Sequence, residues 1–120
     1  MLKEDFAIQS NVRRILVRSN IDHTKIDFGT VRGVVYFRGI FRMTRVYTYG
    51  ENDEASRDFK IYDFTVKSLV SLEKKVRSLP GVSDVIFQFL NWRKERGLWT
   101  RVEMKKKKVI DYGRENDPTV

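Results

Sequence analysis

The chain of 120 residues has no cysteine, only two prolines and a single histidine, and these shortages exclude several classes of protein. Without cysteine there is no disulfide framework and no thiolate zinc site, so the redox compartment stays open. The longest unbroken apolar run, Val34 to Phe37, is far too short to span a bilayer. Met1 to Asp5 leads into no apolar segment, so no signal peptide is predicted. We expect a cytoplasmic or peripheral membrane protein, and a periplasmic one only if a leader has been removed.

Groups suited to catalysis are equally scarce. The only histidine, His23, lies in a polar turn, whereas general-base catalysis needs an oriented partner and a pocket. No serine occupies a G-x-S-x-G elbow, and the chain has neither a P-loop nor a dinucleotide fingerprint. The acidic cluster in residues 51–58 lacks the ligand spacing and glycine of an EF-hand. We therefore expect a protein that is not an enzyme and that has no cofactor and no metal.

The apolar pattern predicts a single α+β domain over residues 1–112, followed by a disordered tail at 113–120. Apolar residues recur at helical spacing over 5–19, where Asn20 suits the end of a helix, and again from residue 63 or 65 to 79, before Pro80 and Gly81. The two apolar stripes consist of Ile8, Val12, Ile15 and Leu16, and of Leu69, Leu72, Val76 and Leu79.

The central strand is predicted at Gly33 to Gly39, a β-branched and aromatic stretch that two glycines bracket. Gly33 suits the positive φ of a turn, and Gly39 suits a close approach of a helix or backbone. Alternation continues past Gly39, and could reach Val46 and Tyr47. It places Val35, Phe37, Phe41 and Met43 on one face, and Val34, Tyr36, Arg38, Ile40 and Arg42 on the other.

The remaining segments complete the predicted sheet. Further strands are expected at about 25–28, 59–62, 85–90 and 98–104, with a turn at Gly29–Thr30, a loop at 49–56, and a turn or single helical turn at 92–96. The fold class is therefore α+β, with two helices packed on one face of a small mixed or antiparallel sheet of three to five strands.

Positive charge is concentrated after Leu90. The net charge is +8, and residues 91–108 alone hold eight basic and two acidic side chains. The cluster consists of Trp92, Arg93, Lys94, Arg96, Trp99, Arg101, Lys105, Lys106, Lys107 and Lys108. Basic groups with tryptophan suit an anionic phospholipid surface, and they equally suit nucleic acid. Alternatively, the tryptophans complete the core and the lysines only keep the protein soluble.

A second candidate surface is the strand face of Val34, Tyr36, Arg38, Ile40 and Arg42. If both helices cover the opposite face, these side chains are exposed and could form a homodimer or peptide interface. The other interpretation is that residues 42–63 or 98–112 fold over this face.

Two short motifs resemble the BON family over about residues 8–90. Gly33-x-Val35-x-Phe37-x-Gly39 is similar to its G-x-V-x-L-x-G core, with Phe37 in the leucine position. Leu79 to Val85 resembles the "GV..V" segment that joins the second helix of that family to its last strand, although residues 42–63 here are an insertion. The resemblance implies a non-enzymatic module that engages an anionic phospholipid surface or an envelope-associated protein, and it identifies no binding residue. The alternatives are a small basic nucleic-acid-binding protein, and a structural or oligomerisation domain without its own ligand.

Overall fold

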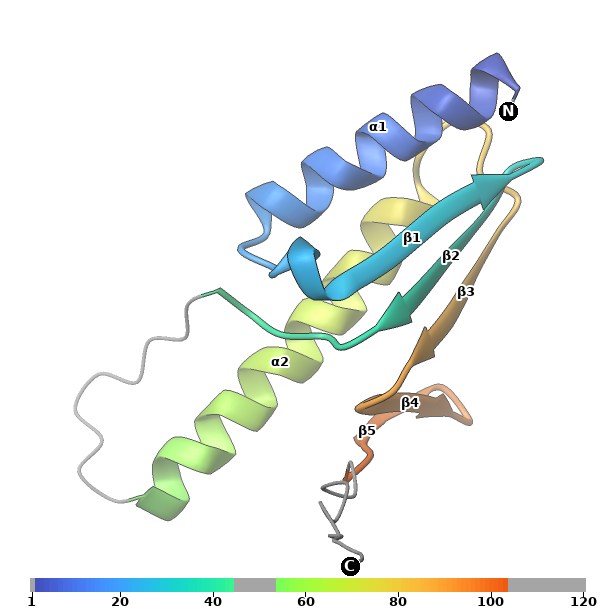
Figure 1. Ribbon diagram of the computed structural model, residues 1–120. Coiled ribbons are helices and arrows are strands. Elements are labelled where there is room, and N and C mark those ends of the chain that lie inside the picture. Colours follow the sequence, from blue (N-terminus) through green and yellow to red (C-terminus); the bar gives the residue numbers. More distant parts are fainter. Residues whose placement is uncertain (1, 45–53, 104–120) are drawn as a thin grey trace, which may run out of the picture.

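Two helices and five strands follow one another along residues 2–44 and 54–103, which the computed structural model describes (Figure 1). In chain order they are α1 (Lys3–Arg18), β1 (Ile26–Val31), β2 (Val34–Gly39), α2 (Glu54–Arg77), β3 (Asp84–Phe89), β4 (Trp92–Glu95) and β5 (Leu98–Arg101), with a short 3₁₀ turn at His23–Lys25. This is the predicted α+β fold. Among the described residues, neither helix is both long and apolar enough to cross a membrane.

The main sheet has three strands in the order β1-β2-β3. β2 lies in the middle, antiparallel to β1 and parallel to β3. A parallel pair needs a crossover connection, and α2 provides it. Figure 1 shows both helices on one side of this sheet, as predicted, while β4 and β5 form a separate antiparallel pair.

The core lies between the helices and the sheet. Both predicted stripes face it: Ile8, Val12 and Leu16 of α1 are buried, and so are Leu69, Leu72 and Val76 of α2. Val35 and Phe37 of β2 are fully buried beneath them. The ring of Phe37 stacks on that of Phe87 with their centroids 5.2 Å apart, which ties β2 to β3. The inward face of the central strand is therefore the one that alternation predicted.

The turn between β1 and β2 consists of Arg32 and Gly33, which both have positive φ. Two residues with positive φ suit the short turn of a hairpin, and the positive φ predicted for Gly33 is confirmed. The buried carboxylate of Asp5 accepts both backbone N–H groups of this turn at 2.9 Å and so fixes the turn to α1. The turn predicted at Gly29–Thr30 is wrong because Gly29 lies inside β1, where the ring of Tyr36 occupies the space that a side chain would need.

Three predicted elements differ from the structure: the strand at 59–62, the turn at 92–96, and the extension of the central strand past Gly39. The strand predicted at 59–62 is part of α2, which begins at Glu54 and so includes the end of the predicted loop. The turn predicted at 92–96 is largely the strand β4. The central strand ends at Gly39, and Val46 and Tyr47 lie outside the described residues, as does the predicted tail at 113–120.

α2 is considerably longer than the strands that it covers. Its 24 residues span about 36 Å, whereas a six-residue strand spans about 20 Å. Figure 1 shows the N-terminal half of α2 continuing past the end of the sheet to the level of β4 and β5. There Tyr62 packs against Trp92, with ring centroids 5.2 Å apart. The small β4–β5 sheet thus supports the part of α2 that the main sheet does not reach.

Candidate functional site

The basic segment after Leu90 folds as a β-hairpin. Trp92 of β4 lies opposite Arg101 of β5, and the two strands are joined by Arg96 and Gly97. Both joining residues have positive φ, which is the geometry of a two-residue hairpin turn. The hairpin therefore presents its side chains from a regular, hydrogen-bonded scaffold.

Trp92 and Trp99 attach this hairpin to the rest of the molecule. Each is only 5% exposed. The ring of Trp99 meets Phe87 of β3 edge-on at 5.0 Å, while Trp92 packs on Tyr62 of α2. The two tryptophans thus complete the core, and the hypothesis that they are surface-binding residues is wrong. They hold the hairpin in place instead.

The basic side chains of the hairpin lie outside. Arg93, Arg96 and Arg101 are exposed, and Arg93 and Arg96 form no ion pair among the residues that the structure describes. The guanidinium of Arg101 lies over the ring of Tyr62, 5.6 Å from its centroid. Lys105, Lys106, Lys107 and Lys108 lie outside the described residues. Together with Lys94, four of the predicted basic residues therefore lie on the one β4–β5 hairpin.

Lys94 differs because it is part of a charged network with α2. Its ammonium lies 2.6 Å from a carboxylate oxygen of Glu73, whose other oxygen pairs with Arg77 at 2.8 Å. Arg77 also reaches Asp84 at 3.2 Å. Burial by itself would raise the pKa of Glu73, but the hydrogen bonds and charges of Lys94 and Arg77 outweigh it and lower that pKa. Glu73 is therefore an ionised link between hairpin and helix.

Leu98 is a surface residue that the sequence analysis did not select. It follows the turn directly, opposite Glu95, and is 70% exposed. Its position is readable from the sequence only once Arg96 and Gly97 are recognised as a two-residue turn. An exposed leucine beside Arg96 gives the tip both apolar and basic character.

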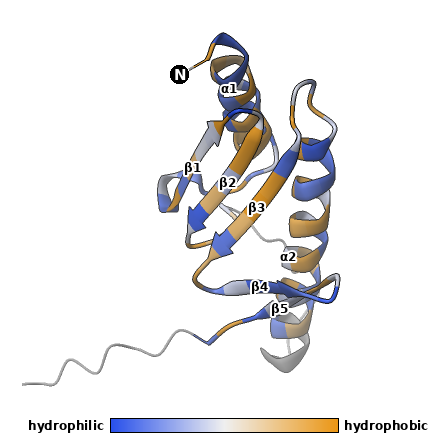
Figure 2. Ribbon diagram, turned by 90° about the vertical axis from the view of Figure 1, so that its right-hand side faces the viewer, coloured by the Kyte–Doolittle hydropathy of each residue, from blue (hydrophilic) through white to orange (hydrophobic). Residues whose placement is uncertain are grey.

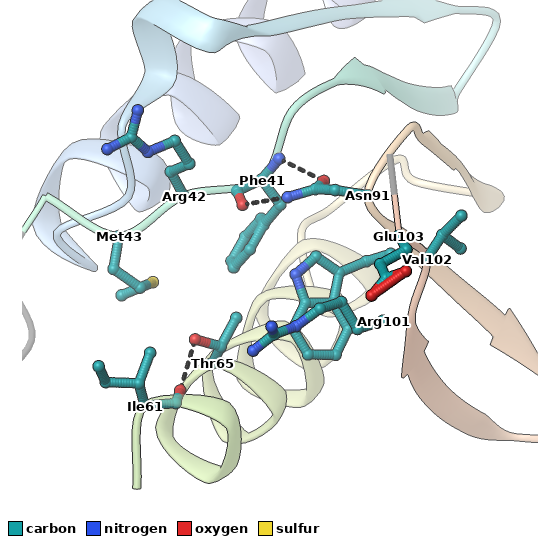
Figure 3. Close-up of a pocket in the computed structure, with 10 residues that line it drawn as sticks. Phe41, Arg42, Met43, Ile61, Thr65, Asn91, Arg101, Val102 and Glu103 are labelled. Atoms are coloured by element: carbon teal, nitrogen blue, oxygen red, sulfur yellow. Dashed lines mark hydrogen bonds between the residues drawn. The ribbon is translucent and has the colours of Figure 1, made fainter. Parts of the chain in front are cut away.

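A hollow of about 450 Å³ lies between the hairpin, α2 and the segment after β2 (Figure 3). Apolar side chains form much of its wall, including Phe41, Met43 and Ile61. The side-chain amide of Asn91 holds one side of it, because its oxygen accepts the N–H of Phe41 and its nitrogen donates to the carbonyl of Phe41, both at 2.9 Å. In Figure 3 the guanidinium of Arg42 points away from the hollow.

The polar groups around this hollow are those that catalysis or metal binding would have to use. The hydroxyl of Thr65 donates to the carbonyl of Ile61 at 2.7 Å and is therefore engaged within the helix. Nowhere in residues 2–44 and 54–103 do three or more histidine or acidic side chains gather as a metal would require. His23 lies half-buried in the 3₁₀ turn, and not in this hollow.

The second candidate surface, the outer face of β2, lies opposite the helices. Arg38 is exposed there, while Val34 and Tyr36 are half-buried. Ile40 and Arg42, which alternation predicted on the same face, follow the end of β2 at Gly39 and are not part of this strand face. In Figure 2 this side of the sheet is turned to the viewer, and no described element crosses it. Residues 54–63 belong to α2 and 98–101 to β5, so these parts of the segments expected to cover the face do not do so. The rest of those segments up to residue 53 and beyond 103 lies largely outside the described residues.

No family model matches the chain, and no curated protein or solved structure matches it either. The resemblance to the BON family therefore stays a prediction that rests on the two short motifs.

Proposed function

We propose that the protein is a non-catalytic, BON-like binding module whose β4–β5 hairpin engages an anionic phospholipid surface. The observation that supports this proposal best is the exposure of Arg93, Arg96 and Arg101 on a hairpin that buried tryptophans anchor. Exposed Leu98 lies beside Arg96 at the tip of this hairpin and suits the boundary between headgroups and acyl chains.

The expected strength of this interaction follows from the number of charges. Each basic side chain near an anionic bilayer contributes about 1 kcal/mol. Lys94 is paired with Glu73, so the three arginines of the hairpin would contribute about 3 kcal/mol, which corresponds to a dissociation constant of roughly 6 mM. The four lysines at 105–108 would raise that free energy to about 7 kcal/mol, which corresponds to a dissociation constant of roughly 10 μM. Hairpin and lysine run are therefore expected to act together.

Two other partners fit the same charges. An envelope-associated protein with an acidic surface would use the same arginines. Nucleic acid is the alternative, and binding of single strands ordinarily uses exposed aromatic rings on which bases stack. Trp92 and Trp99 are buried and offer no such platform, so contact with the phosphates of a duplex is the form of this alternative that the hairpin suits. A structural domain without its own ligand is the third possibility.

Vesicle co-sedimentation with matched charge variants tests the proposal. Arg93→Gln with Arg96→Gln should weaken binding to phosphatidylglycerol-containing vesicles roughly 30-fold, because two charges near the bilayer are worth about 2 kcal/mol. Arg14→Gln with Arg18→Gln removes the same charge from exposed positions of α1 and should change binding less than about threefold. Binding to phosphatidylcholine vesicles should stay weak for every variant.

Two results would contradict the proposal. Equal losses in the two double variants would mean that only net charge matters. Tighter binding to duplex oligonucleotides than to vesicles, at matched phosphate concentration and salt, would favour the nucleic-acid alternative.

A further inference from the structure

The outer face of the main sheet carries an apolar centre that no described element covers. The register places Val31, Val34 and Ile86 around Tyr36 on this face. Val31 is 58% and Ile86 is 43% exposed.

Tyr36 makes this face flat. Its phenol ring lies across β1 in contact with Gly29, so that even a methyl group at position 29 would collide with it. The guanidinium of Arg38 in turn lies over the ring of Tyr36, 5.2 Å from the centroid. Because Gly29 has no side chain, the ring of Tyr36 can lie flat on β1, and this part of the face does not protrude. Such a face suits a second flat surface as its partner.

The charges around this apolar centre have both signs. Asp27 stands directly opposite Arg38 in the β1–β2 register. Asp84, which begins β3, is already paired with Arg77 at 3.2 Å. Asp27 and Arg38 form no ion pair with each other, and Asp27 has no charged partner within residues 2–44 and 54–103. In a molecule of net charge +8, this face is thus a mixed one with free groups of opposite sign.

We propose that this face is the contact surface of a symmetric homodimer. A two-fold interface is self-complementary, so that an Asp27–Arg38 contact between the copies would occur twice. The apolar centres around Tyr36 would cover each other, as in other packed sheets. An anionic membrane or a nucleic acid would leave Asp27 without a partner, whereas a second copy offers Arg38 to it, which makes a second copy the better occupant.

The size of the face limits the strength of this dimer. Three strands about 4.8 Å apart and about 20 Å long give a footprint of roughly 280 Å² per copy, against about 800 Å² in a standard interface. The dimer is therefore expected to be weak and to form at roughly 0.1–1 mM protein. This inference is independent of the hairpin and of its partner.

Sedimentation equilibrium up to about 1 mM protein tests the inference. The unmodified chain should show a concentration-dependent monomer–dimer equilibrium. Ile86→Lys should weaken association at least tenfold. Val70→Lys, which changes an apolar residue of similar exposure (50%) on α2, should leave association unchanged. Thermal unfolding of each variant establishes that it is folded.

Charge reversal makes the test specific. Arg38→Asp alone and Asp27→Arg alone should each weaken association at least tenfold, and the double variant should restore it to within about threefold. Because the chain has no cysteine, Val34→Cys and Val70→Cys add a second readout, and only Val34→Cys should give a covalent dimer with a short thiol-reactive crosslinker that spans the roughly 10 Å between packed sheets.

Several results would overturn the proposal. The unmodified chain could stay monomeric throughout the concentration range. Val70→Lys could weaken association as much as Ile86→Lys does. A monomeric chain in which Ile86→Lys weakens vesicle binding would assign the face to the lipid instead.

Discussion

Gly39 joins three strands at one point of the backbone. It has a φ of +100°, and a side chain there would collide with the carbonyl oxygen of Lys25. That same oxygen accepts the N–H of Ile40 at 3.0 Å, while the carbonyl of Gly39 accepts the N–H of Leu90 at 2.8 Å. The close backbone approach that was predicted for Gly39 is thus confirmed, and it links the end of β2 to the residue before β1 and to the residue after β3.

Replacing Gly39 should cost more than its backbone conformation alone explains. Gly97 has a similar positive φ but has nothing within 4 Å of the position where a side chain would begin. Gly97→Ala should therefore lower the free energy of unfolding by only about 1–2 kcal/mol, the cost of a left-handed non-glycine residue. Gly39→Ala should lower it by at least about 3 kcal/mol, since the collision with backbone adds to that strain. Urea denaturation measures both, and equal losses would mean that the backbone near Lys25 yields easily.

At the scale of whole elements, a single polar residue explains why half of α2 was not predicted. Thr65 occupies a buried position of the helix, where the stripe that continues to Leu69 and Leu72 would ordinarily hold an apolar residue. Its hydroxyl is satisfied by the carbonyl of Ile61 within the helix, so burial costs little. Meanwhile Phe59, 70% exposed, alternates with charged residues and imitates a strand. The periodicity was therefore misleading before Thr65 and reliable after it.

The hairpin shows a similar limit of sequence reasoning at the candidate site. The charge distribution located the basic segment, and the alternation after Gly97 indicated a strand. Alternation does not say which face is buried, however, and the structure buries Trp99 and exposes Leu98. The difference depends on tertiary contacts: Trp99 packs on Phe87 of β3, and Trp92, on the same face of the hairpin, packs on Tyr62 of α2.

The link between Glu73 and the hairpin should make stability depend on pH. The pKa of Glu73 is lower in the folded protein than its ordinary value of 4.5. Its ionised form therefore contributes stability that is present above pH 4.5 and is lost as the pH falls through the lowered pKa. Glu73→Gln should cost about 1–2 kcal/mol at pH 7 and reduce the loss of stability in acid. Tryptophan fluorescence during urea denaturation at each pH measures this directly.

Glu95→Gln is the matched control for that experiment. Glu95 is an exposed carboxylate of the same hairpin with no ion-pair partner among the described residues. The Glu95→Gln substitution should change neither the free energy of unfolding at pH 7 nor the loss of stability in acid. A loss as large as that in Glu73→Gln would show that the overall charge of the hairpin, and not the link to α2, is responsible.

At the scale of the whole molecule, stability depends on both helices covering the same face of the sheet. Leu16 of α1 and Leu72 of α2 are each at most 1% exposed and belong to one core with Val35 and Phe37. The two helical stripes made this arrangement predictable from the sequence. The other side of the sheet stays open among the described residues.

Truncation of either leucine tests this two-layer arrangement. Leu16→Ala and Leu72→Ala should each lower the free energy of unfolding by about 2–5 kcal/mol, because each leaves a cavity in a packed core. Val70→Ala, at a half-exposed position of α2, should cost less than about 0.5 kcal/mol. Chemical denaturation provides the values. Losses below 0.5 kcal/mol at both leucines would mean that the core does not depend on these helices.

The parallel pairing of β2 with β3 has a consequence for the order in which the molecule is assembled. β1 and β2 are neighbours in sequence and can pair locally, whereas β3 can join β2 only after the chain has passed through α2. Long-range pairing of this kind is slow because the intervening loop must close first. The β4–β5 hairpin, whose tryptophans pack on β3 and α2, then has no surface to dock on until that closure is complete. During refolding, the two tryptophans should therefore become buried in the last step. The rate of the change in their fluorescence should measure how fast β3 pairs with β2.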